Sequence, residues 1–360
     1  MFDIFSQKLD TFGLDISDLS LKIAKLEKKK GRIKLVSFGS LSLPSLIIKK
    51  GEIKDKKILA EKIKELLENS QGEKLKTTKV ICSLPKEKSF LNVIRFPKIK
   101  VKEIKQTIEY EIKNHISLPI EQIYFDFEII KPVLNNQKFT EVLIAISPKT
   151  IVDSYIDTLK MANLEPQILE IECQSIARTL IKGGKTINSI LLIDFGETRT
   201  TFIIFCGRNI RFTSTIPISS KKLTQSISKN LKISAKKAEQ LKIGYGLEGK
   251  KEISKAIIPT LTVLSEQIKT LLEYWKSHKK RAETLYEGGA VEKILICGEG
   301  ARLKGLTNFL TEQLKIPVQL GNPWVNIIKT LVGETPYLNF EKSLGYTTAL
   351  GLALRGARKL

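Results

Sequence analysis

Histidine and cysteine are scarce in this 360-residue sequence, which has two histidines and four cysteines. Both histidines, His115 and His278, lie in charged stretches that are predicted to be helical, so we do not expect a histidine-based metal site or catalytic triad. The cysteines lie far apart, with no two at metal-ligand spacing, at Cys82, Cys173, Cys206 and Cys297. Three of them fall in apolar, strand-like runs, where cysteine behaves as a small hydrophobic residue. This usage indicates a reducing, cytosolic environment.

Long apolar runs are also absent. The first residues, MFDIFSQKLDTFGLDIS, include acidic side chains and no apolar core, so we do not expect a secretory signal peptide. No segment approaches the roughly 20 apolar residues that are needed to cross a bilayer. We therefore expect a cytoplasmic chain that reaches the membrane only through a partner.

Acidic residues are outnumbered, with 38 Asp and Glu against 60 Lys and Arg and a formal net charge of +22. The basic residues are spread along the chain, which indicates a solvated, lysine-rich surface rather than a polyanion-binding patch. The basic turn KKKGR at residues 28–32 has no aromatic residues beside it for stacking, so we expect no nucleic-acid binding. The charge would still attract the chain to anionic lipids, by about 1 kcal/mol for each well-placed Lys or Arg.

Two segments in different halves of the chain share one plan. They are LDISDLSLKIAKLEKKKGRIKLVSF at residues 14–38 and IDFGETRTTFIIFCGRNIRFTSTIP at residues 193–217. Each places an Asp between apolar residues, then a polar turn with hydroxyl groups, then two more strands. Helical patterns alternate with strands along the chain, which predicts a mixed α/β fold. Residues 54–72 are predicted to form an amphipathic helix, and the apolar residues from Ile257 to Trp275 recur at helical spacing, which predicts a buried helix face. The repeated plan predicts a duplicated fold whose two halves face a shared cleft.

Asp15 and Asp194 occupy the same position in the two repeats. A carboxylate at the end of a buried strand is unfavourable unless something compensates its charge. If a nucleotide with Mg²⁺ lay in the cleft, the two carboxylates could hold the hydrated cation. The turns could then present backbone N–H groups and hydroxyl groups to the phosphates. The alternative is two ordinary hairpins in which each Asp binds the backbone of its own turn.

Two downstream segments fit the same picture. ILICGEGARLKG, residues 294–305, places a glycine-rich turn between a strand and a helix and could lie against an adenine and its sugar. It is not the dinucleotide fingerprint, because Leu303 fills the third glycine position. In AKKAEQLK, Glu239 and Lys242 share a helix face and could reach ribose hydroxyls, although such spacing also suits an exposed ion pair.

Together these segments resemble the two phosphate motifs, the ribose motif and the adenosine motif of the actin-like ATPase superfamily. Their order resembles the branch that contains FtsA and PilM, and the stretches at 95–130, 214–227 with 236–242, and 294–324 favour the PilM type. The resemblance implies a bilobed actin-like (duplicated RNase-H-like) α/β fold with an inserted small subdomain, 1C. It implies a first core, 1A, at 8–85, 165–188 and 336–360, the insert at 86–164, a second core, 2A, at 189–235 and 288–335, and a helical subdomain, 2B, at 236–287.

The resemblance also implies a function. It predicts a cytoplasmic ATP-binding component of the type IV pilus assembly platform that docks the N-terminal cytoplasmic tail of PilN between the first core and the insert. The chain would lie at the inner face of the cytoplasmic membrane, with other platform proteins, motor ATPases and further copies of itself as additional partners. ATP and Mg²⁺ are the implied ligands, with hydrolysis weak or absent. The alternatives are an FtsA-like division protein and a metabolite kinase, for which Glu170 and Glu172 are the only candidate acids.

The resemblance assigns the nucleotide contacts residue by residue. They are Gly13, Asp15, Ser17 and Lys22 in the first phosphate loop, Asp194, Gly196, Thr198 and Thr200 in the second, Glu239 and Lys242 on the ribose helix, and Gly298, Gly300 and Arg302 in the adenosine loop. Asp15 and Asp194 would hold Mg²⁺ through water. Ser17 with Asp18 departs from the family pattern in the first loop, and Glu197 with Arg199 departs from it in the second. We expect the added bulk and charge to weaken nucleotide binding.

Overall fold

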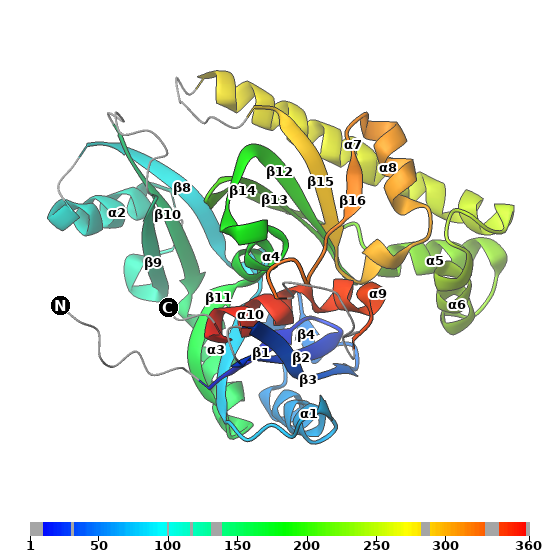
Figure 1. The fold of residues 1–360 in the computed structure, drawn as a ribbon, viewed down its shortest axis with the longest axis horizontal. Coiled ribbons are helices and arrows are strands. Elements are labelled where there is room, and N and C mark those ends of the chain that lie inside the picture. The colour runs from blue at the N-terminus through cyan, green and yellow to red at the C-terminus, as the bar shows by residue number, and fades with distance from the viewer. Residues whose placement is uncertain are drawn as a thin grey trace.

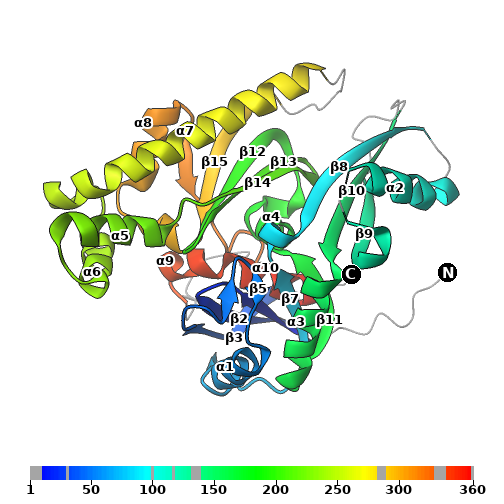
Figure 2. The ribbon, with the colours of Figure 1, turned by 180° about the vertical axis from the view of Figure 1, so that it is seen from behind.

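A computed structural model describes residues 10–29, 32–98, 101–115, 118–130, 139–281, 289–327 and 338–357. It shows two lobes, each built on its own sheet, and a smaller sheet beside them (Figure 1, and from behind in Figure 2). Residues 30–31 of the predicted basic turn lie outside the described residues, as do the predicted subdomain bounds at 8, 287–288, 336 and 360.

The first lobe has a sheet with the order β11-β7-β1-β2-β3-β6. Its strands are β1 (Phe12–Ile16), β2 (Ser20–Lys29), β3 (Arg32–Ser42), β6 (Gln71–Gly72), β7 (Lys79–Leu84) and β11 (Glu165–Ile171). Helices α1 (Lys56–Glu68) and α3 (Lys149–Met161) share an apolar cluster with Phe12 and Leu14. Helices α4 (Glu172–Leu180) and α10 (Thr347–Ala357) pack together near the opposite face, where α10 contacts β1 and β2. Because side chains alternate along a strand, Asp15 and Lys22 point to this second face.

The second lobe repeats this arrangement. Its sheet has the order β14-β13-β12-β15-β16, formed by β12 (Thr186–Phe195), β13 (Thr200–Gly207), β14 (Asn209–Ile216), β15 (Val291–Cys297) and β16 (Val318–Leu320). As in β1-β2-β3, the first three strands are antiparallel, and β15 and β16 extend the sheet in parallel as β7 and β11 do. The matching strand orders confirm the predicted duplicated, bilobed fold. Helices α5 (Ser220–Leu231), α6 (Ala235–Tyr245), α7 (Lys251–Arg281) and α8 (Leu306–Leu314) complete the lobe.

The insert is a three-stranded sheet that contacts the second lobe. It consists of β8 (Phe90–Pro97), β9 (Ile123–Ile130) and β10 (Phe139–Pro148), with α2 (Val101–His115) contributing to the apolar cluster on one face. Arg211 on β14 pairs with Glu141 on β10 at 2.7 Å, and Thr213 donates a hydrogen bond to the carbonyl of Leu91 at 3.1 Å. The insert is therefore joined to the second lobe by these polar contacts and by an apolar cluster that Leu91 and Leu143 share with Phe205.

Two details differ from the expected pattern. The predicted helix at residues 54–72 ends at Glu68, and Gln71–Gly72 instead pair with β3 as an edge strand. Helix α3, which the predicted boundaries place in the insert, contributes Ile151, Val152 and Tyr155 to the apolar cluster of the first lobe. This packing favours an insert that ends near residue 148.

The remaining elements are short or connect the lobes. They are β4 (Ile48–Lys49), β5 (Glu52–Ile53), η1 (Lys86–Lys88), η2 (Ile120–Gln122), η3 (Lys182–Gly184), η4 (Glu299–Arg302), α9 (Phe340–Ser343) and η5 (Leu344–Tyr346). All four cysteines are buried and free. In the described part of the chain, no helix has the length and apolar character needed to span a bilayer.

Candidate functional site

Two turns, one from each lobe, line a single cavity of about 50 Å³. The first turn joins β1 to β2, and the second joins β12 to β13. Seven of the predicted contact residues line this cavity: Asp15, Ser17, Lys22, Asp194, Gly196, Thr198 and Gly298. The tertiary structure therefore brings together residues that are almost 300 positions apart in the sequence.

A second, larger cavity of about 370 Å³ adjoins the first. It is lined by the four other predicted contacts Glu239, Lys242, Gly300 and Arg302. The two cavities share the lining residues Leu19, Glu197 and Glu299, so they form neighbouring parts of one cleft. A volume of this size lies within the range of about 300–1,000 Å³ that is typical of small-molecule sites.

Gly13 and Thr200 do not line these cavities. A Cβ added to Gly13 would lie 2.4 Å from the carbonyl oxygen of Ala349, because helix α10 packs directly against β1 there. Thr200 is fully buried, and its hydroxyl donates a hydrogen bond to the carbonyl of Ile218 at 2.7 Å. Both residues therefore stabilise the lobes next to the cleft.

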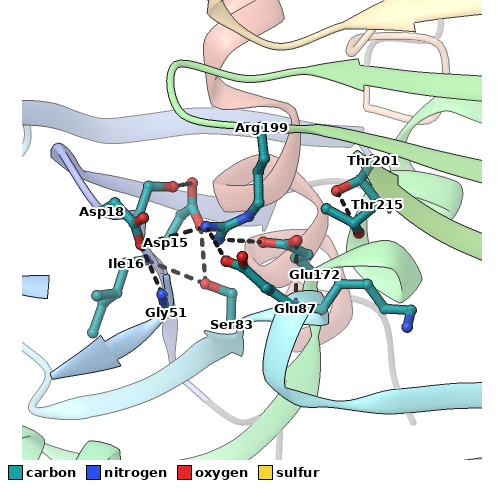
Figure 3. Close-up of polar contacts among 12 residues, drawn as sticks. Asp15, Ile16, Asp18, Gly51, Ser83, Glu87, Glu172, Arg199, Thr201 and Thr215 are labelled. Carbon is teal, nitrogen blue, oxygen red and sulfur yellow. Dashed lines mark hydrogen bonds and ion pairs between the residues drawn. The ribbon is translucent and has the colours of Figure 1, made fainter. Parts of the chain in front are cut away.

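Asp15 is held within the first lobe. Ser83 donates a hydrogen bond from Oγ to Asp15 Oδ1 at 2.9 Å (Figure 3). Lys22 is the cross-strand neighbour of Asp15 on β2. Burial raises the pKa of Asp15, although Lys22, Ser83 and Arg199 act in the opposite direction. The sequence analysis did not identify Ser83, because β7 is distant along the chain from both repeated turns.

Asp194 is the last residue but one of β12 and lines the same cavity as Asp15. Burial raises the pKa of Asp194 to about 7, with Glu172 and Asp15 adding to the shift. Gly298 lies against this carboxylate with a φ of +86°, and a Cβ added to it would be 2.3 Å from Asp194 Oδ1. A glycine is therefore required there for both the backbone conformation and the close approach.

Ion pairs cross the cleft in both directions. Lys22 of the first lobe pairs with Glu299 of the second at 3.3 Å. Arg199 of the second lobe lies 3.4 Å from Asp18, 3.2 Å from Glu87 and 3.9 Å from Glu172, all in the polypeptide before residue 173 (Figure 3). These pairs leave little open volume between the two turns.

Asp18, one of the departures from the family pattern, is well compensated. Its carboxylate accepts hydrogen bonds from the backbone N–H groups of Lys50 and Gly51, at 3.1 and 2.9 Å, and faces Arg199. Burial disfavours the charged form of Arg199, but Glu172, Asp18 and Glu87 outweigh it and raise the pKa of the guanidinium. Asp18 therefore does not act as an isolated negative charge in the cleft.

Lys242 and Glu239, the pair predicted to contact a ribose, differ in burial. Lys242 is only 5% exposed and donates hydrogen bonds to Ser220 Oγ at 2.6 Å and Thr224 Oγ1 at 2.9 Å. Its ammonium group also pairs with the half-exposed Glu239 at 2.8 Å. Burial lowers the pKa of Lys242. The alternative of an exposed surface pair therefore does not describe the lysine, which lies on the wall of the larger cavity.

The two candidate acids have different surroundings. The carboxylate of Glu170 is bound by Arg178, at 2.5 and 2.8 Å, and by Arg355, which leaves it no free oxygen to direct a water molecule. Glu172 lines the smaller cavity and accepts a hydrogen bond from the backbone N–H of Lys86 at 3.3 Å. Burial raises the pKa of Glu172, partly offset by Arg199.

The smaller cavity is acidic. Six carboxylates line it, Asp15, Asp18, Glu172, Asp194, Glu197 and Glu299, against the two cations Lys22 and Arg199. Across the described residues, no group of three or more His, Cys, Asp or Glu side chains is arranged to hold a metal by itself. Mg²⁺ in proteins usually keeps several waters and takes one or two carboxylates plus phosphate oxygens. Two aspartates facing one cavity fit such a water-mediated cation.

Comparisons with known proteins agree with this arrangement. The family model described as type IV pilus assembly protein PilM matches residues 13–357. A chain from a solved PilM–PilN type IV pilus biogenesis complex aligns with 98% of this chain over 100% of its own length. The two are 25% identical in sequence, with a TM-score of 0.80. The cell division protein FtsA of Streptococcus pneumoniae is 24% identical over 96% of this chain and 82% of its own length. MreB5 of Spiroplasma citri bound to ADP shares the fold at 11% identity, with a TM-score of 0.53 over 94% of each chain. With its duplicated lobes, its shared cleft and a family match over most of its length, this chain belongs to the family of the type IV pilus assembly protein PilM.

Proposed function

We propose that this chain is an ATP-binding component of the type IV pilus inner-membrane platform that docks the N-terminal cytoplasmic tail of PilN. The observation that carries the proposal is the convergence of both Asp turns and the Lys242 wall on one cleft, in a chain of the PilM family. In this proposal nucleotide occupancy sets the closure of the lobes, and closure sets the affinity for the pilus partner.

The larger cavity would receive the nucleoside. Lys242 and Glu239 are placed to contact the ribose, and the backbone at Gly300 with Arg302 would lie against the adenine. The smaller cavity has room for a few waters but not for a triphosphate. Nucleotide binding in this proposal therefore requires the two turns to move apart.

The phosphate end of the cleft would depend on a divalent cation. When bound, Mg²⁺ supplies positive charge that neutralises the phosphate oxygens. Asp15 and Asp194 would hold its water shell from opposite lobes, and Lys22 would contact the phosphates. The acidic lining supports this requirement, because six carboxylates would otherwise repel a polyphosphate.

The partner site would lie between the insert and the first lobe. The matched PilM–PilN complex supports the choice of partner. In this chain the half-exposed Tyr124 on β9 donates a hydrogen bond to Asp153 on α3 at 3.2 Å, so the insert and the first lobe meet there. A peptide bound at this junction would hold the chain at the inner face of the cytoplasmic membrane.

Two measurements test the proposal. ATP with Mg²⁺ should raise the temperature of thermal unfolding of the purified protein, and Asp194→Ala should abolish that increase while leaving the fold intact. A labelled peptide of the PilN N-terminus should give an anisotropy change at micromolar protein, whereas a scrambled peptide should not. If ATP stabilises Asp194→Ala as much as the wild type, Asp194 does not belong to the nucleotide site. If the PilN peptide gives no anisotropy change, the proposed pilus partner is wrong.

An FtsA-like division function is the second candidate. The match to the pneumococcal FtsA along most of this chain favours it over a metabolite kinase. The family model and the match to the PilM–PilN complex support the pilus function more strongly. ATP binding together with failure to bind the PilN peptide would move the assignment to this alternative.

A further inference from the structure

Arg199 is a nearly buried cation in a position for which the repeated motif gives no role. It lies in the turn between β12 and β13, beside Gly196 and Thr198, and its side chain is 11% exposed. The guanidinium lines the smaller cavity and reaches from the second lobe to acidic residues on the other side of the cleft (Figure 3). A charged group with five N–H donors is thereby placed where the phosphates of a nucleotide would enter.

The contacts of Arg199 are numerous but loose. The only hydrogen bond that its guanidinium donates among the described residues is to Glu87 at 3.2 Å, and Asp18 and Glu172 lie at 3.4 and 3.9 Å. Charge-assisted N–H···O bonds are usually about 2.7–2.9 Å long. Arg178 of the same chain, by comparison, binds Glu170 through two shorter hydrogen bonds of 2.5 and 2.8 Å. Arg199 is therefore attracted to three carboxylates at once, and none of them forms a bidentate pair with it.

A terminal phosphate group is such a partner. The planar guanidinium fork matches two phosphate oxygens, and this geometry distinguishes Arg from Lys as a phosphate ligand. The cavity that Arg199 lines is also lined by Gly196 and Thr198 of the same turn and by Asp15 and Asp194, the residues proposed to orient the metal-bound phosphates. The donors that the present partners leave unused therefore lie on the path of a polyphosphate.

We propose that Arg199 binds the terminal phosphate of the nucleotide, exchanging its carboxylate partners for phosphate oxygens and so distinguishing ATP from ADP. This inference rests on the proposed function of the cleft. The exchange also removes the hydrogen bond to Glu87, which lies in η1 just before β8, the first strand of the insert. Occupancy of the cleft by ATP thereby loosens one tie between the second lobe and the start of the insert.

The test compares affinities for ATP and ADP, each with Mg²⁺, by isothermal titration calorimetry on the full chain. Arg199→Ala should weaken ATP binding by about tenfold or more and ADP binding much less, because a charged hydrogen-bonding pair is lost only with the terminal phosphate. Arg199→Lys should give an intermediate ATP affinity, since it keeps the charge but loses the fork. The matched control is Arg208→Ala, an exposed arginine at the other end of β13, which should change neither affinity.

A second variant gives a result of opposite sign. Glu87→Gln removes a competing carboxylate without removing Arg199, so it should strengthen ATP binding by about two- to fivefold. The exposed Glu61→Gln is its control. In the double variant Arg199→Ala/Glu87→Gln this gain should disappear. Because Glu87→Gln keeps every positive charge, it tests the inference even if Arg199→Ala folds poorly.

The outcomes separate the inference from the proposed function. If the wild-type chain binds ATP, but Arg199→Ala and Arg199→Lys keep the wild-type ratio of ATP to ADP affinity, the role of Arg199 is overturned and the nucleotide site stands. An unchanged ATP affinity in Glu87→Gln also contradicts the exchange. If the wild-type chain binds no nucleotide, the proposed function and the inference fail together.

Discussion

Lys22 and Glu299 form an ion pair across the cleft, with Lys22 Nζ 3.3 Å from Glu299 Oε1. Lys22 comes from β2 of the first lobe, and Glu299 comes from the turn after β15 of the second. Burial disfavours the charge on Lys22, but Glu299 and Asp15 outweigh it and raise the pKa of the lysine. Glu299 also pairs with Arg302 at 3.1 Å. This glutamate therefore lies between the smaller and the larger cavity and lines both.

Replacing Lys22 by alanine should weaken ATP binding by about tenfold, because a charged contact to the phosphates is lost. The fold should remain, since Glu299 keeps Arg302 as a partner. Titration calorimetry with ATP and Mg²⁺ measures the change, and Lys29→Ala, a half-exposed lysine at the end of β2, is the control. Equal ATP affinity in Lys22→Ala and the wild type would place the phosphates elsewhere.

The affinity for ATP with Mg²⁺ should increase as the pH is raised from 6 to 8. The pKa of Asp194 is about 7, so much of this carboxyl group is neutral at pH 6, and a cation binds the charged form. Affinity measured at constant ionic strength should follow this titration. Asp194→Asn should bind weakly throughout and show a flat profile. A wild-type profile equally flat between pH 6 and 8 would contradict the role of Asp194.

The same group predicts an opposite effect on stability. Because its pKa is higher in the folded chain than the ordinary value of 3.8, the folded state holds the proton more tightly than the unfolded state. Its stabilising contribution is complete below about pH 4 and is lost as the pH rises through about 7. Asp194→Asn should therefore be more stable than the wild type at pH 8, by about 1–3 kcal/mol, and nearly equal at pH 4. Urea unfolding at both pH values measures the difference, and a less stable variant at pH 8 would refute it.

Gly298→Ala should damage both the fold and the site. A residue other than glycine at a φ of +86° costs about 1–3 kcal/mol, and the new Cβ would displace the carboxylate of Asp194. We expect a lower free energy of unfolding together with loss of ATP-dependent stabilisation. Gly289→Ala is the matched control, because nothing lies within 4 Å of a Cβ built there. Normal ATP binding by Gly298→Ala would show that the position of Asp194 is not critical.

Gly13→Ala should separate stability from binding. The added Cβ would lie 2.4 Å from the carbonyl oxygen of Ala349, so helix α10 must shift, and we expect a loss of about 1–3 kcal/mol. The ATP affinity of the molecules that remain folded should stay near the wild-type value, because Gly13 does not line the cleft. Thermal unfolding and calorimetry distinguish the two effects. If Gly13→Ala instead lost ATP affinity at normal stability, Gly13 would belong to the nucleotide site and this prediction would be wrong.

Local patterns in the sequence determined the elements and much of the site. The shared plan around Asp15 and Asp194 predicted two equivalent sheets and one cleft, because strand alternation and turn composition are properties of neighbouring residues. The apolar stripe from Ile257 to Trp275 likewise predicted a buried helix face, and its members are buried on α7. The end of α1 was misplaced, because β6 depends on a pairing with β3 that local pattern does not encode.

Only the tertiary structure decided which residues from distant parts of the chain contact one another. Gly13 matches a nucleotide motif in the sequence, but α10, more than 330 residues away, makes it a packing residue. From the sequence, Arg199 is expected only to weaken nucleotide binding. In the folded chain it forms ion pairs with Asp18, Glu87 and Glu172. The pKa of Asp194 has the same origin, because burial and a neighbouring carboxylate act through space and not along the chain.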